Sequence, residues 1–522
     1  MLLAEAVGRT LAAAGADHVF GLVGSGNFHV TNALIACGAR FVPAAHEGGA
    51  ATMADAFARV SGRRCVLSVH QGPGVTNALT GITEAAKSRT PLIVLAPEAA
   101  NPRSNFYLDL EALAGAIGAA FVRVRDVEDV ARAWALEGTV IMSLPLDAQG
   151  SEATPIDVGP PLDAASDVDI SALVRMLERA ERPVFIAGRG AVRARGALIG
   201  LADRCGALLA TSAAAKGLFE GDPRNLDVSG GFASPRAASL IAASDLIVAW
   251  GSTLNMWTTR HGRLIGPQAT VVQVDRDPAA LGANRPIDLG VVGDAAAVAL
   301  AATSAYRGVR PKAETGGSIR WRDVSYVDEG GAGTIDPRTL SIALDDLLPA
   351  ARTLATDSGN FMGYPSMFMS VPDVHGFVFT QAFQSIGLGL ASAIGAALAR
   401  PDRLAVAALG DGGFLMSVAE LTTIARLGIP MVIVIYNDAA FGAEVYHFGP
   451  DGHPLGTVTF PDSDLAAIAQ GFGCDAVTVR SVSDLDPVRK WLDSSRERAL
   501  VIDAKVRSER GSWWLEEAFR GH

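Results

Sequence analysis

Two acidic side chains stand at the ends of apolar runs, at a spacing that could hold a metal ion. The run 404–409 ends just before Asp411, and the run 431–436 ends just before Asp438, 27 residues further on. That spacing fits one helix and one returning strand, and parallel strands end at the same edge of a sheet. Two neighbouring carboxylates repel each other unless a cation lies between them. Because Mg²⁺ prefers oxygen ligands, the sequence predicts a magnesium site at Asp411 and Asp438.

The residues around Asp411 also favour an anion. Gly410, Gly412 and Gly413 allow close approach to the backbone, and a helix predicted from Phe414 onward would direct its free N–H groups to the same place. An anion such as phosphate would suit both features. For the glycine turn alone, an ordinary turn with a capping aspartate is an equal alternative. The polar pair Asn437-Asp438 at the end of the next strand favours the ligand site.

The elements that must position these residues follow from the hydrophobic pattern. Short apolar runs alternate with segments of helical period, which is typical of parallel sheets covered by helices on both faces. The predicted fold class is α/β, with three doubly wound parallel-sheet domains. We expect these domains at 1–160, 170–304 and 335–522, with polar linkers at about 150–169 and 306–333.

Composition excludes several classes of protein. The chain has 522 residues, 49% of them hydrophobic and 19% charged, which is typical of a globular protein. A net charge of −11 without a basic run makes a nucleic-acid partner unexpected. The apolar segments are too short and too often interrupted by charges to predict a membrane span. Four widely separated cysteines predict free thiols and a cytoplasmic location.

Several motifs, in order along the chain, resemble those of thiamine diphosphate (ThDP) enzymes. The stretch GDGGFLMSVAELTTIARLGIPMVIVIYNDAAFG resembles the diphosphate and metal motif. The stretch AHEGGAATMADAFARVSGR, at 45–63, resembles the segment with the catalytic glutamate, and VHQGPGVTNALTGITEAAKSRTPLIVLA follows it at 69–96. The chain is therefore similar to the family of acetolactate synthase, benzoylformate decarboxylase and pyruvate decarboxylase. This resemblance implies a pyrimidine-binding, a central and a diphosphate-binding domain.

The resemblance assigns cofactor and metal contacts. It implies that Asp411 and Asp438 bind Mg²⁺ through their side chains and Ala440 through its carbonyl. The family usually has Asn at the position of Asp438, so we expect a stronger demand for Mg²⁺ or a shifted pKa there. A bulky side chain at Ile386 is expected to hold ThDP in its bent form. The implied cofactor contacts are Gly359, Asn360, Ile386, Gly410, Gly412, Gly413 and Phe414.

Glu47 has the central catalytic role in this resemblance. Its carboxyl group is expected to hydrogen-bond the pyrimidine ring of ThDP and so promote removal of the C2 proton. Taken alone, Glu47 would be interpreted as an acid favoured at the start of a helix, but the accompanying motifs favour the catalytic role. The implied reaction is ThDP- and Mg-dependent decarboxylation of a 2-oxo acid, with or without carboligation to an acceptor carbonyl.

The substrate-side predictions rest on residues near strand ends. His70 is predicted to be catalytic because histidine exchanges protons near neutral pH; the alternative is a loop histidine held by the backbone. We expect the substrate pocket to include Ser25, Gln71, Phe441 and Glu444. The charge of Glu444 would suit a polar or cationic acceptor.

Other functions remain open at this point. One is a ThDP-dependent lyase or hydrolase that has no decarboxylation step. Another is a nucleotide-dependent oxidoreductase that uses the glycines at 188–190, although they lack the full dinucleotide fingerprint. A third is a scaffold that has lost activity. In the family, Glu47 of one chain and Asp411 of another meet the same cofactor, so the resemblance implies a homodimer or homotetramer. The sequence does not identify the donor, the acceptor or a nucleotide in the central domain.

Overall fold

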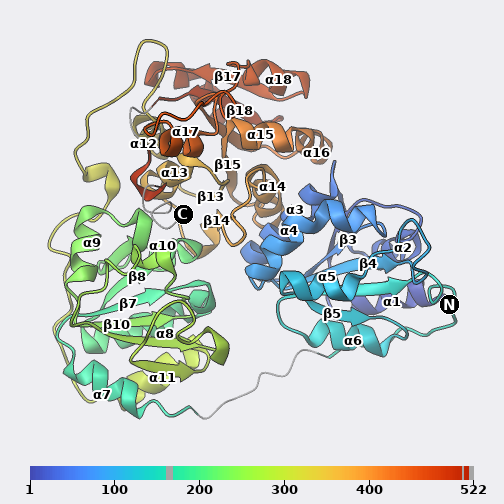
Figure 1. The fold of residues 1–522 in the computed structure, drawn as a ribbon, viewed down its shortest axis with the longest axis horizontal. Helices are drawn as coiled ribbons and strands as arrows, with labels where there is room; N and C mark the ends of the chain where they lie inside the picture. The colour runs from blue at the N-terminus through green and yellow to red at the C-terminus, as the bar shows by residue number, and fades with distance from the viewer. Residues whose placement is uncertain (160–167, 508–510, 516–522) are drawn as a thin grey trace.

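Three six-stranded sheets organise the computed structural model, which describes residues 1–159, 168–507 and 511–515 (Figure 1). Neighbouring strands in each sheet are parallel. Strands such as β4 (Leu92–Glu98) and β6 (Thr139–Pro145) are buried along their whole length, as expected for sheets covered on both faces. The predicted α/β fold with three doubly wound sheets is confirmed.

The N-terminal domain has the strand order β2-β1-β3-β4-β6-β5. Its other strands are β1 (His18–Gly21), β2 (Arg40–Pro43), β3 (Cys65–Ser68) and β5 (Ala120–Arg123). Its helices are α1 (Leu3–Ala13), α2 (Phe28–Ala36), α3 (Glu47–Ser61), α4 (Pro73–Lys87), α5 (Leu110–Ile117) and α6 (Glu128–Ala135).

The central domain has a different strand order, β12-β11-β10-β7-β8-β9. Its strands are β7 (Pro183–Ala187), β8 (Leu208–Thr211), β9 (Asn225–Val228), β10 (Leu246–Trp250), β11 (Thr270–Asp275) and β12 (Leu289–Val292). Its helices are α7 (Ser171–Arg179), α8 (Arg195–Cys205), α9 (Pro235–Ala242), α10 (Met256–Thr259) and α11 (Ala295–Ala305). The 3-10 turns η1 (Arg189–Ala194), η2 (Ala213–Ala215), η3 (Gly230–Phe232) and η4 (Pro278–Ala280) lie between them.

The C-terminal domain repeats the topology of the N-terminal one, with the order β14-β13-β15-β16-β18-β17. Its strands are β13 (Arg352–Thr356), β14 (Phe377–Phe379), β15 (Leu404–Gly410), β16 (Val432–Asn437), β17 (Asp475–Val479) and β18 (Leu500–Lys505). Its helices are α12 (Pro337–Leu347), α13 (Gly363–Phe368), α14 (Gly389–Ala399), α15 (Asp411–Ser417), α16 (Leu421–Leu427), α17 (Gly442–Phe448), α18 (Leu465–Gly471) and α19 (Asp486–Leu492). Its 3-10 turns are η6 (Asn360–Met362), η7 (Val374–Gly376), η8 (Val418–Glu420) and η9 (Val482–Leu485), and η5 (Trp321–Asp323) lies in the linker before it.

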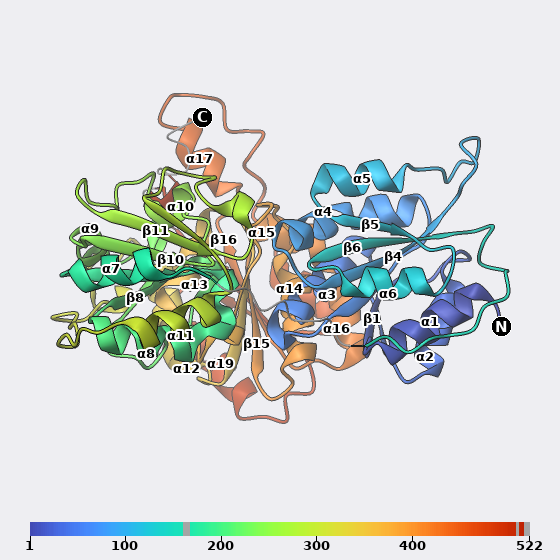
Figure 2. The same ribbon diagram turned by 90° about the horizontal axis from the view of Figure 1, so that it is seen from below.

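Helices α3 and α14 join the N-terminal and C-terminal domains, and Figure 2 shows them side by side between the two sheets. Both helices contribute to one hydrophobic core, with Phe57 from α3 and Ile394 from α14. Their backbones approach closely, because a Cβ added at Gly395 would overlap the carbonyl of Met53. Gly395 is therefore needed for the contact between the two domains.

We expect Gly395→Ala to destabilise this interface by about 1–3 kcal/mol, since the added methyl group meets backbone that cannot move aside cheaply. Gly200→Ala in α8 is the matched control, because a Cβ there meets nothing within 4 Å. The control should be neutral or stabilising by up to about 1 kcal/mol, as Ala is the better helix former. Urea unfolding of both variants measures the difference, and equal stabilities would contradict the explanation.

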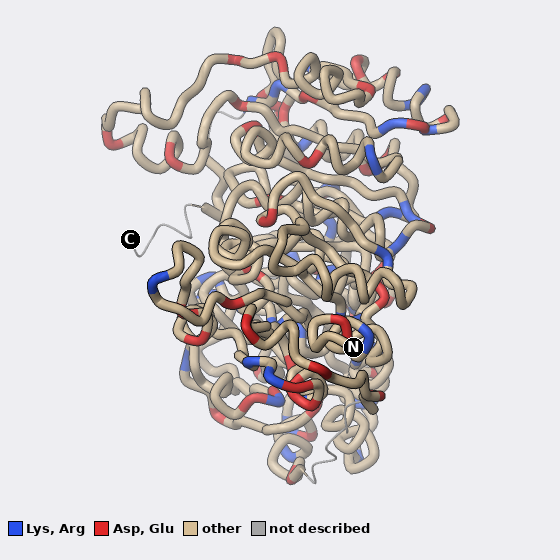
Figure 3. Tube along the Cα trace, turned by 90° about the vertical axis from the view of Figure 1, so that its right-hand side faces the viewer, with Lys and Arg blue, Asp and Glu red and all other residues tan. Residues whose placement is uncertain are grey.

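The charges are distributed over the molecule, and Figure 3 shows basic and acidic residues intermingled along the chain. The four cysteines are free thiols, of which Cys37 is exposed and the others are buried. In the described ranges, every helix is too short or too polar to reach across a lipid bilayer.

Candidate active site

The two predicted metal-binding carboxylates lie at the ends of adjacent strands. β15 and β16 are paired in parallel, Asp411 is the first residue of α15, and Asp438 directly follows β16. Burial raises the pKa of Asp411 to about 6. Burial and the negative charge of Asp411 raise the pKa of Asp438 to about 7, so the expected shift is present. Such a pair favours a bound cation.

The loop after β16 is fixed by its own hydrogen bonds. The Asn437 amide donates to Asp503 Oδ1 at 2.8 Å and accepts from the Ala439 N–H at 3.2 Å. Ala439 has a left-handed backbone with φ of 54°. The N–H groups of Ala439 and Ala440 hydrogen-bond to the Asp411 carboxylate. Ala440, the predicted carbonyl ligand, therefore lies beside the first carboxylate.

The donor set fits Mg²⁺. Within the described residues, no three His, Cys, Asp or Glu side chains cluster in a way that could hold a metal. Two carboxylates and a backbone carbonyl provide only oxygen atoms, which suit Mg²⁺ rather than zinc. Mg²⁺ commonly completes its shell with phosphate oxygens and water. The chemistry of the site is thus consistent with a metal that also binds a diphosphate.

The glycines near Asp411 are required by their neighbours. A Cβ at Gly412 would lie 2.6 Å from the Phe441 ring, and one at Gly413 would overlap the Asp357 carboxylate. The helix begins at Asp411, three residues before the predicted start, and η8 interrupts it before α16. The Phe414 side chain is fully buried in the core, so only its backbone can face a ligand.

Asn360 begins the turn η6, and Gly359 directly precedes it. Gly359 has a φ of 137°, a conformation that favours glycine. Asn360 is buried, and its side-chain and backbone oxygens accept from the Ser512 hydroxyl at 2.6 and 2.8 Å. The sequence did not indicate Ser512, which lies 152 residues away.

The loop that carries Ile386 connects β14 to α14. Ile386 is half-buried. Asp357, at the end of β13, accepts from the N–H groups of Gly387 at 2.9 Å and Leu388 at 3.2 Å. Burial raises the pKa of Asp357 to about 6, although these hydrogen bonds act in the opposite direction. Asp357 therefore anchors the residues that directly follow Ile386.

Glu47 is the first residue of α3 and is half-buried. Its Oε2 accepts from the Asn77 amide at 3.1 Å, which orients the carboxylate. His46 caps the helix, since its Nδ1 accepts from the Gly48 N–H at 3.0 Å. These contacts belong to the N-terminal domain, whereas the contacts of Asp411 and Asp438 belong to the C-terminal domain. Asn77 was not predicted from the sequence.

The structure brings His70 and Ser25 together across 45 residues of chain. His70 Nε2 lies 3.4 Å from the Ser25 hydroxyl, and His70 Nδ1 lies 3.0 Å from the carbonyl of Gln71. Because a carbonyl only accepts, Nδ1 carries the proton in the neutral ring and the Nε2 lone pair faces Ser25. A Cβ at Gly24 would overlap the imidazole, so glycine is needed there.

Gln71 and Asn27 line the same turn. Gln71 is 4% exposed, and its Oε1 has no hydrogen-bond partner in the part of the chain that the structure describes. Asn27 was not predicted; it is fully buried, accepts from the Gly24 N–H at 2.8 Å and donates to the Leu22 carbonyl and the Ser68 hydroxyl, both at 3.0 Å. Asn27 therefore fixes the turn that presents Ser25.

Phe441 and Glu444 come from the C-terminal domain. The Phe441 ring lies against Gly412 and edge-on to Phe460, at a ring-centre distance of 4.9 Å. Glu444 lies in the first turn of α17 and is half-buried. The predicted pocket residues thus divide between two domains: Ser25 and Gln71 come from one, together with the predicted catalytic His70, and Phe441 and Glu444 come from the other.

The glycines of the central domain serve packing. A Cβ at Gly188 would overlap the carbonyl of Gly251, and one at Gly190 would lie 2.8 Å from the Gly251 Cα. The Gly190 N–H donates to the same carbonyl at 3.1 Å. These contacts account for the glycines without a bound nucleotide.

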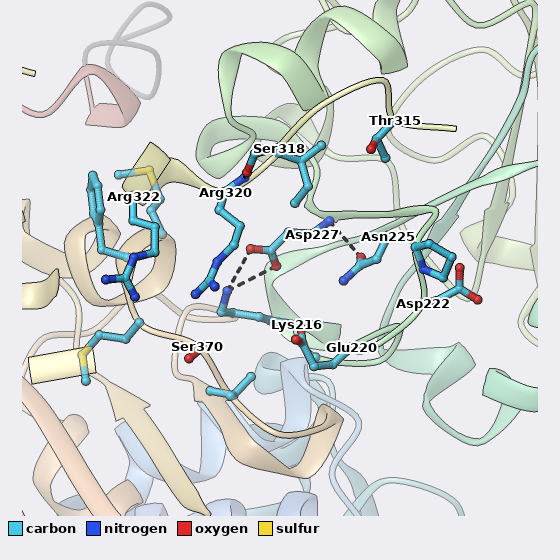
Figure 4. Close-up of a pocket in the computed structure, with 18 of the residues that line it drawn as sticks. Lys216, Glu220, Asp222, Asn225, Asp227, Thr315, Ser318, Arg320, Arg322 and Ser370 are labelled. Atoms are coloured by element: carbon cyan, nitrogen blue, oxygen red, sulfur yellow. Dashed lines mark hydrogen bonds and ion pairs between the residues drawn. The ribbon is translucent and has the colours of Figure 1, made fainter. Parts of the chain in front are cut away.

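A cavity of about 410 Å³ lies elsewhere, between the central and C-terminal domains. Figure 4 shows Lys216 and Asp227 paired in it, with Nζ and Oδ2 3.1 Å apart. Its lining comes from 216–227, 315–322 and 367–371, which contain none of the predicted site residues.

Comparisons with known proteins give matches along the chain. Residues 1–114, 170–302 and 357–504 match the thiamine pyrophosphate enzyme N-terminal TPP binding domain, central domain and C-terminal TPP binding domain, respectively. The sulfoacetaldehyde acetyltransferase of Rhodobacter capsulatus is 30% identical over 99% of this chain and 96% of its own length. A probable 2-ketoarginine decarboxylase of Pseudomonas aeruginosa is 29% identical over 94% of this chain and 90% of its own length.

A solved structure has the same fold. The thiamine diphosphate-dependent 4-hydroxybenzoylformate decarboxylase of Rhodococcus jostii superimposes with a TM-score of 0.82, covering 98% of this chain and all of that one, at 21% identity. The three family matches occur in chain order and the acetyltransferase aligns over nearly the full length of both proteins, so the resemblance is confirmed. The chain belongs to the thiamine pyrophosphate enzyme family.

Proposed function

We propose that the protein is a ThDP- and Mg²⁺-dependent enzyme that decarboxylates a 2-oxo acid and either protonates the remaining fragment or joins it to an acceptor carbonyl. The observation that carries this proposal is the pair Asp411 and Asp438 at the ends of the adjacent strands β15 and β16, where the repulsion between two buried carboxylates favours a cation between them. The pair lies in the segment that matches the C-terminal TPP binding domain. Relatives whose names describe a decarboxylase and an acetyltransferase support both outcomes.

The chain's residues have separate tasks in this proposal. Asp411, Asp438 and the Ala440 carbonyl would hold Mg²⁺, and the Ile386 loop would support the cofactor. Glu47, oriented by Asn77, holds and donates a proton at the pyrimidine ring. The bound cofactor supplies the electron sink for the pair left behind when CO₂ departs.

His70 and Ser25 serve the substrate. With its Nδ1 proton directed at the Gln71 carbonyl, His70 can take up or deliver a proton only at Nε2, which faces the Ser25 hydroxyl. A proton can then pass between Nε2 and a substrate oxygen, directly or through that hydroxyl. The buried Oε1 of Gln71, which has no partner among the described residues, is a further hydrogen-bond acceptor beside this turn.

A second copy of the chain completes the site in this proposal, giving a homodimer or homotetramer. The contacts of Glu47 are within its own domain. By the family resemblance, Asp411 of another chain would meet the same cofactor. Large apolar side chains near the diphosphate motif support a covered surface: Met416 is 60% exposed, Leu415 42% and Phe383 44%. Met416 also lies beside Gly387, next to Ile386.

A panel of 2-oxo acids, tested with ThDP and Mg²⁺ and with and without aldehyde acceptors, examines the proposed reaction. We expect CO₂ release from at least one acid and its loss when either ThDP or Mg²⁺ is removed. Analysis of the products separates simple decarboxylation from carboligation. Cleavage of a substrate without CO₂ release would support the lyase or hydrolase alternative and contradict the proposal.

The same panel of 2-oxo acids, applied to His70→Ala, tests whether His70 is a general acid–base group. We expect kcat to fall by about 100-fold or more, as for the loss of a general acid–base group. ThDP affinity should stay near that of the wild type, since His70 contacts Ser25 and the Gln71 backbone. Unchanged kcat would instead identify His70 as a loop histidine held by the backbone.

A further inference from the structure

The N-terminal and C-terminal domains meet as two copies of one topology. Their sheets have the same strand order, and α3 and α14, which follow the second strand of each sheet, pack against each other. The segment that leads into α3 ends at Glu47, the first residue of that helix, and the segment just before α14 carries Ile386. The two segments therefore occupy equivalent places on opposite sides of one interface.

Glu420 of the C-terminal domain binds the loop before Glu47. Its Oε2 accepts from the Ala45 N–H and its Oε1 from the His46 N–H, both at 3.1 Å. The Thr423 hydroxyl donates to Oε2 at 2.6 Å, and Glu420 is only 2% exposed. A Cβ at Gly49, in the first turn of α3, would overlap Oε1. The carboxylate thus fits closely against the start of the helix that presents Glu47.

Glu84 of the N-terminal domain makes the reciprocal contact. It is 1% exposed and accepts from the Ala382 N–H at 3.2 Å and the Phe383 N–H at 2.6 Å. These two residues lie three or four positions before Ile386. Arg59 strengthens the contact, because it donates to Glu84 at 2.9 Å and to the carbonyl of Phe379, the last residue of β14, at 3.1 Å.

The two glutamates occupy equivalent positions in the topology. Glu84 lies in α4, which follows the third strand β3, and Glu420 lies in η8, in the helical stretch that follows the third strand β15. Each holds two successive N–H groups in the segment after the second strand of the other domain. Burial acts to raise the pKa of Glu84, but Arg59 and the hydrogen bonds outweigh it and keep the pKa below its usual value. Glu84 is therefore an ionised acceptor.

We propose that Glu420 and Glu84 are a reciprocal pair of positioning residues, in which each domain fixes the cofactor loop of the other: Glu420 the loop before Glu47, and Glu84 the loop before Ile386. The assignment of the two loops to the cofactor rests on the proposed function, whereas the contacts themselves do not. Glu420 fixes the loop before Glu47, on the pyrimidine side of the cofactor. In the same chain, α15 and η8 link Glu420 to Asp411, which serves the diphosphate side.

Amide hydrogen exchange on the cofactor-free protein tests the contacts. In Glu420→Ala we expect the amides of Ala45 and His46 to exchange at least about tenfold faster while those of Ala382 and Phe383 stay protected, and in Glu84→Ala the reverse. Asp129→Asn is the matched control: Asp129 is a buried carboxylate that accepts from the N–H groups of Arg125 and Asp126, within the N-terminal domain. The Asp129→Asn control should leave amide exchange in both loops unchanged.

Two cofactor readouts test the positioning. We expect Glu420→Ala to slow deuterium exchange at C2 of bound ThDP by about 100-fold, as for a misplaced catalytic group, and to alter its pH profile, with little change in ThDP affinity. Glu84→Ala should weaken ThDP binding by about tenfold or more, because Ile386 loses its support. Glu420→Gln keeps one acceptor oxygen, so it should recover part of the exchange rate; it also replaces Glu420→Ala if that variant does not fold.

The outcomes separate this proposal from the proposed function. If the wild type and Asp129→Asn neither bind ThDP nor exchange its C2 proton, the proposed function fails. If they do, and folded Glu420 and Glu84 variants match them in loop protection and in both cofactor readouts, the positioning role is overturned. Loss of loop protection with unchanged cofactor readouts would also overturn it, because the contacts would then be structural only.

Discussion

Glu47→Gln is expected to lower turnover by about 10²–10⁴-fold while ThDP remains bound, as for the loss of a general acid–base group. The glutamine side chain keeps the shape of the glutamate and can still meet the Asn77 amide through its oxygen, so the start of α3 should not move. What is lost is the proton at the pyrimidine ring. Steady-state kinetics together with calorimetric titration of ThDP separate the two effects.

Glu128→Gln is the matched control for this variant. Glu128 is also the first residue of a helix in the N-terminal domain, but it is exposed. Activity of the control should equal that of the wild type. Turnover of Glu47→Gln within a few-fold of the wild type would sink the assigned role, and the residue would then be an acid favoured at a helix start.

Mixing Glu47→Gln with Asp411→Asn tests whether two chains share one site. In a mixed dimer of shared sites, one site carries both substitutions and the other carries neither. An equal mixture that exchanges subunits should therefore recover about a quarter of wild-type activity. If each chain forms its own site, the mixture stays as inactive as the two variants.

Features that depend on local pattern could be predicted from the sequence. The apolar runs before Asp411 and Asp438 indicated adjacent strand ends. In the structure the two carboxylates follow the paired strands β15 and β16, because parallel strands end at one sheet edge. The same reasoning put His70 after β3, and the structure adds Ser25 beside it. The glycines at 188–190 showed only a weak nucleotide signal, and contact with Gly251 now explains them.

Features that depend on contact between distant segments could not be predicted. Glu420 meets Ala45 across 375 residues, and Ser512 meets Asn360 across 152. Both polar residues occur in ordinary helical or tail sequence, and their role arises only when whole domains pack. The helix boundary at Asp411 was also missed, because glycines at 412 and 413 are poor helix formers that tertiary packing tolerates here.

Mg²⁺ and ThDP together are expected to raise the thermal midpoint of the protein more at pH 8 than at pH 5.5. The ordinary pKa of an Asp carboxyl is 3.8, but in the folded chain it is about 6 for Asp411 and about 7 for Asp438. Between these values the folded protein binds more protons than the unfolded chain, so stability without ligands falls as the pH rises. A bound cation removes the repulsion between the two carboxylates. Below about pH 7 the cation must displace the protons that these carboxylates bind.

Substitutions at Asp411 and Asp438 separate the contributions of the two carboxylates to Mg²⁺ binding and to its pH dependence. Asp411→Asn should weaken Mg²⁺ binding by about 100-fold or more, since even outer partners of a metal contribute 10- to 100-fold. Asp438→Asn leaves an amide oxygen and removes one of the two titrating groups, so Mg²⁺ affinity should change by less than about tenfold and depend less steeply on pH. Asp475→Asn, at an exposed site in the same domain, should change neither property. Affinities measured between pH 5.5 and pH 8 decide the matter: if Asp438→Asn keeps the full pH dependence, the repulsion between the two carboxylates does not control metal binding.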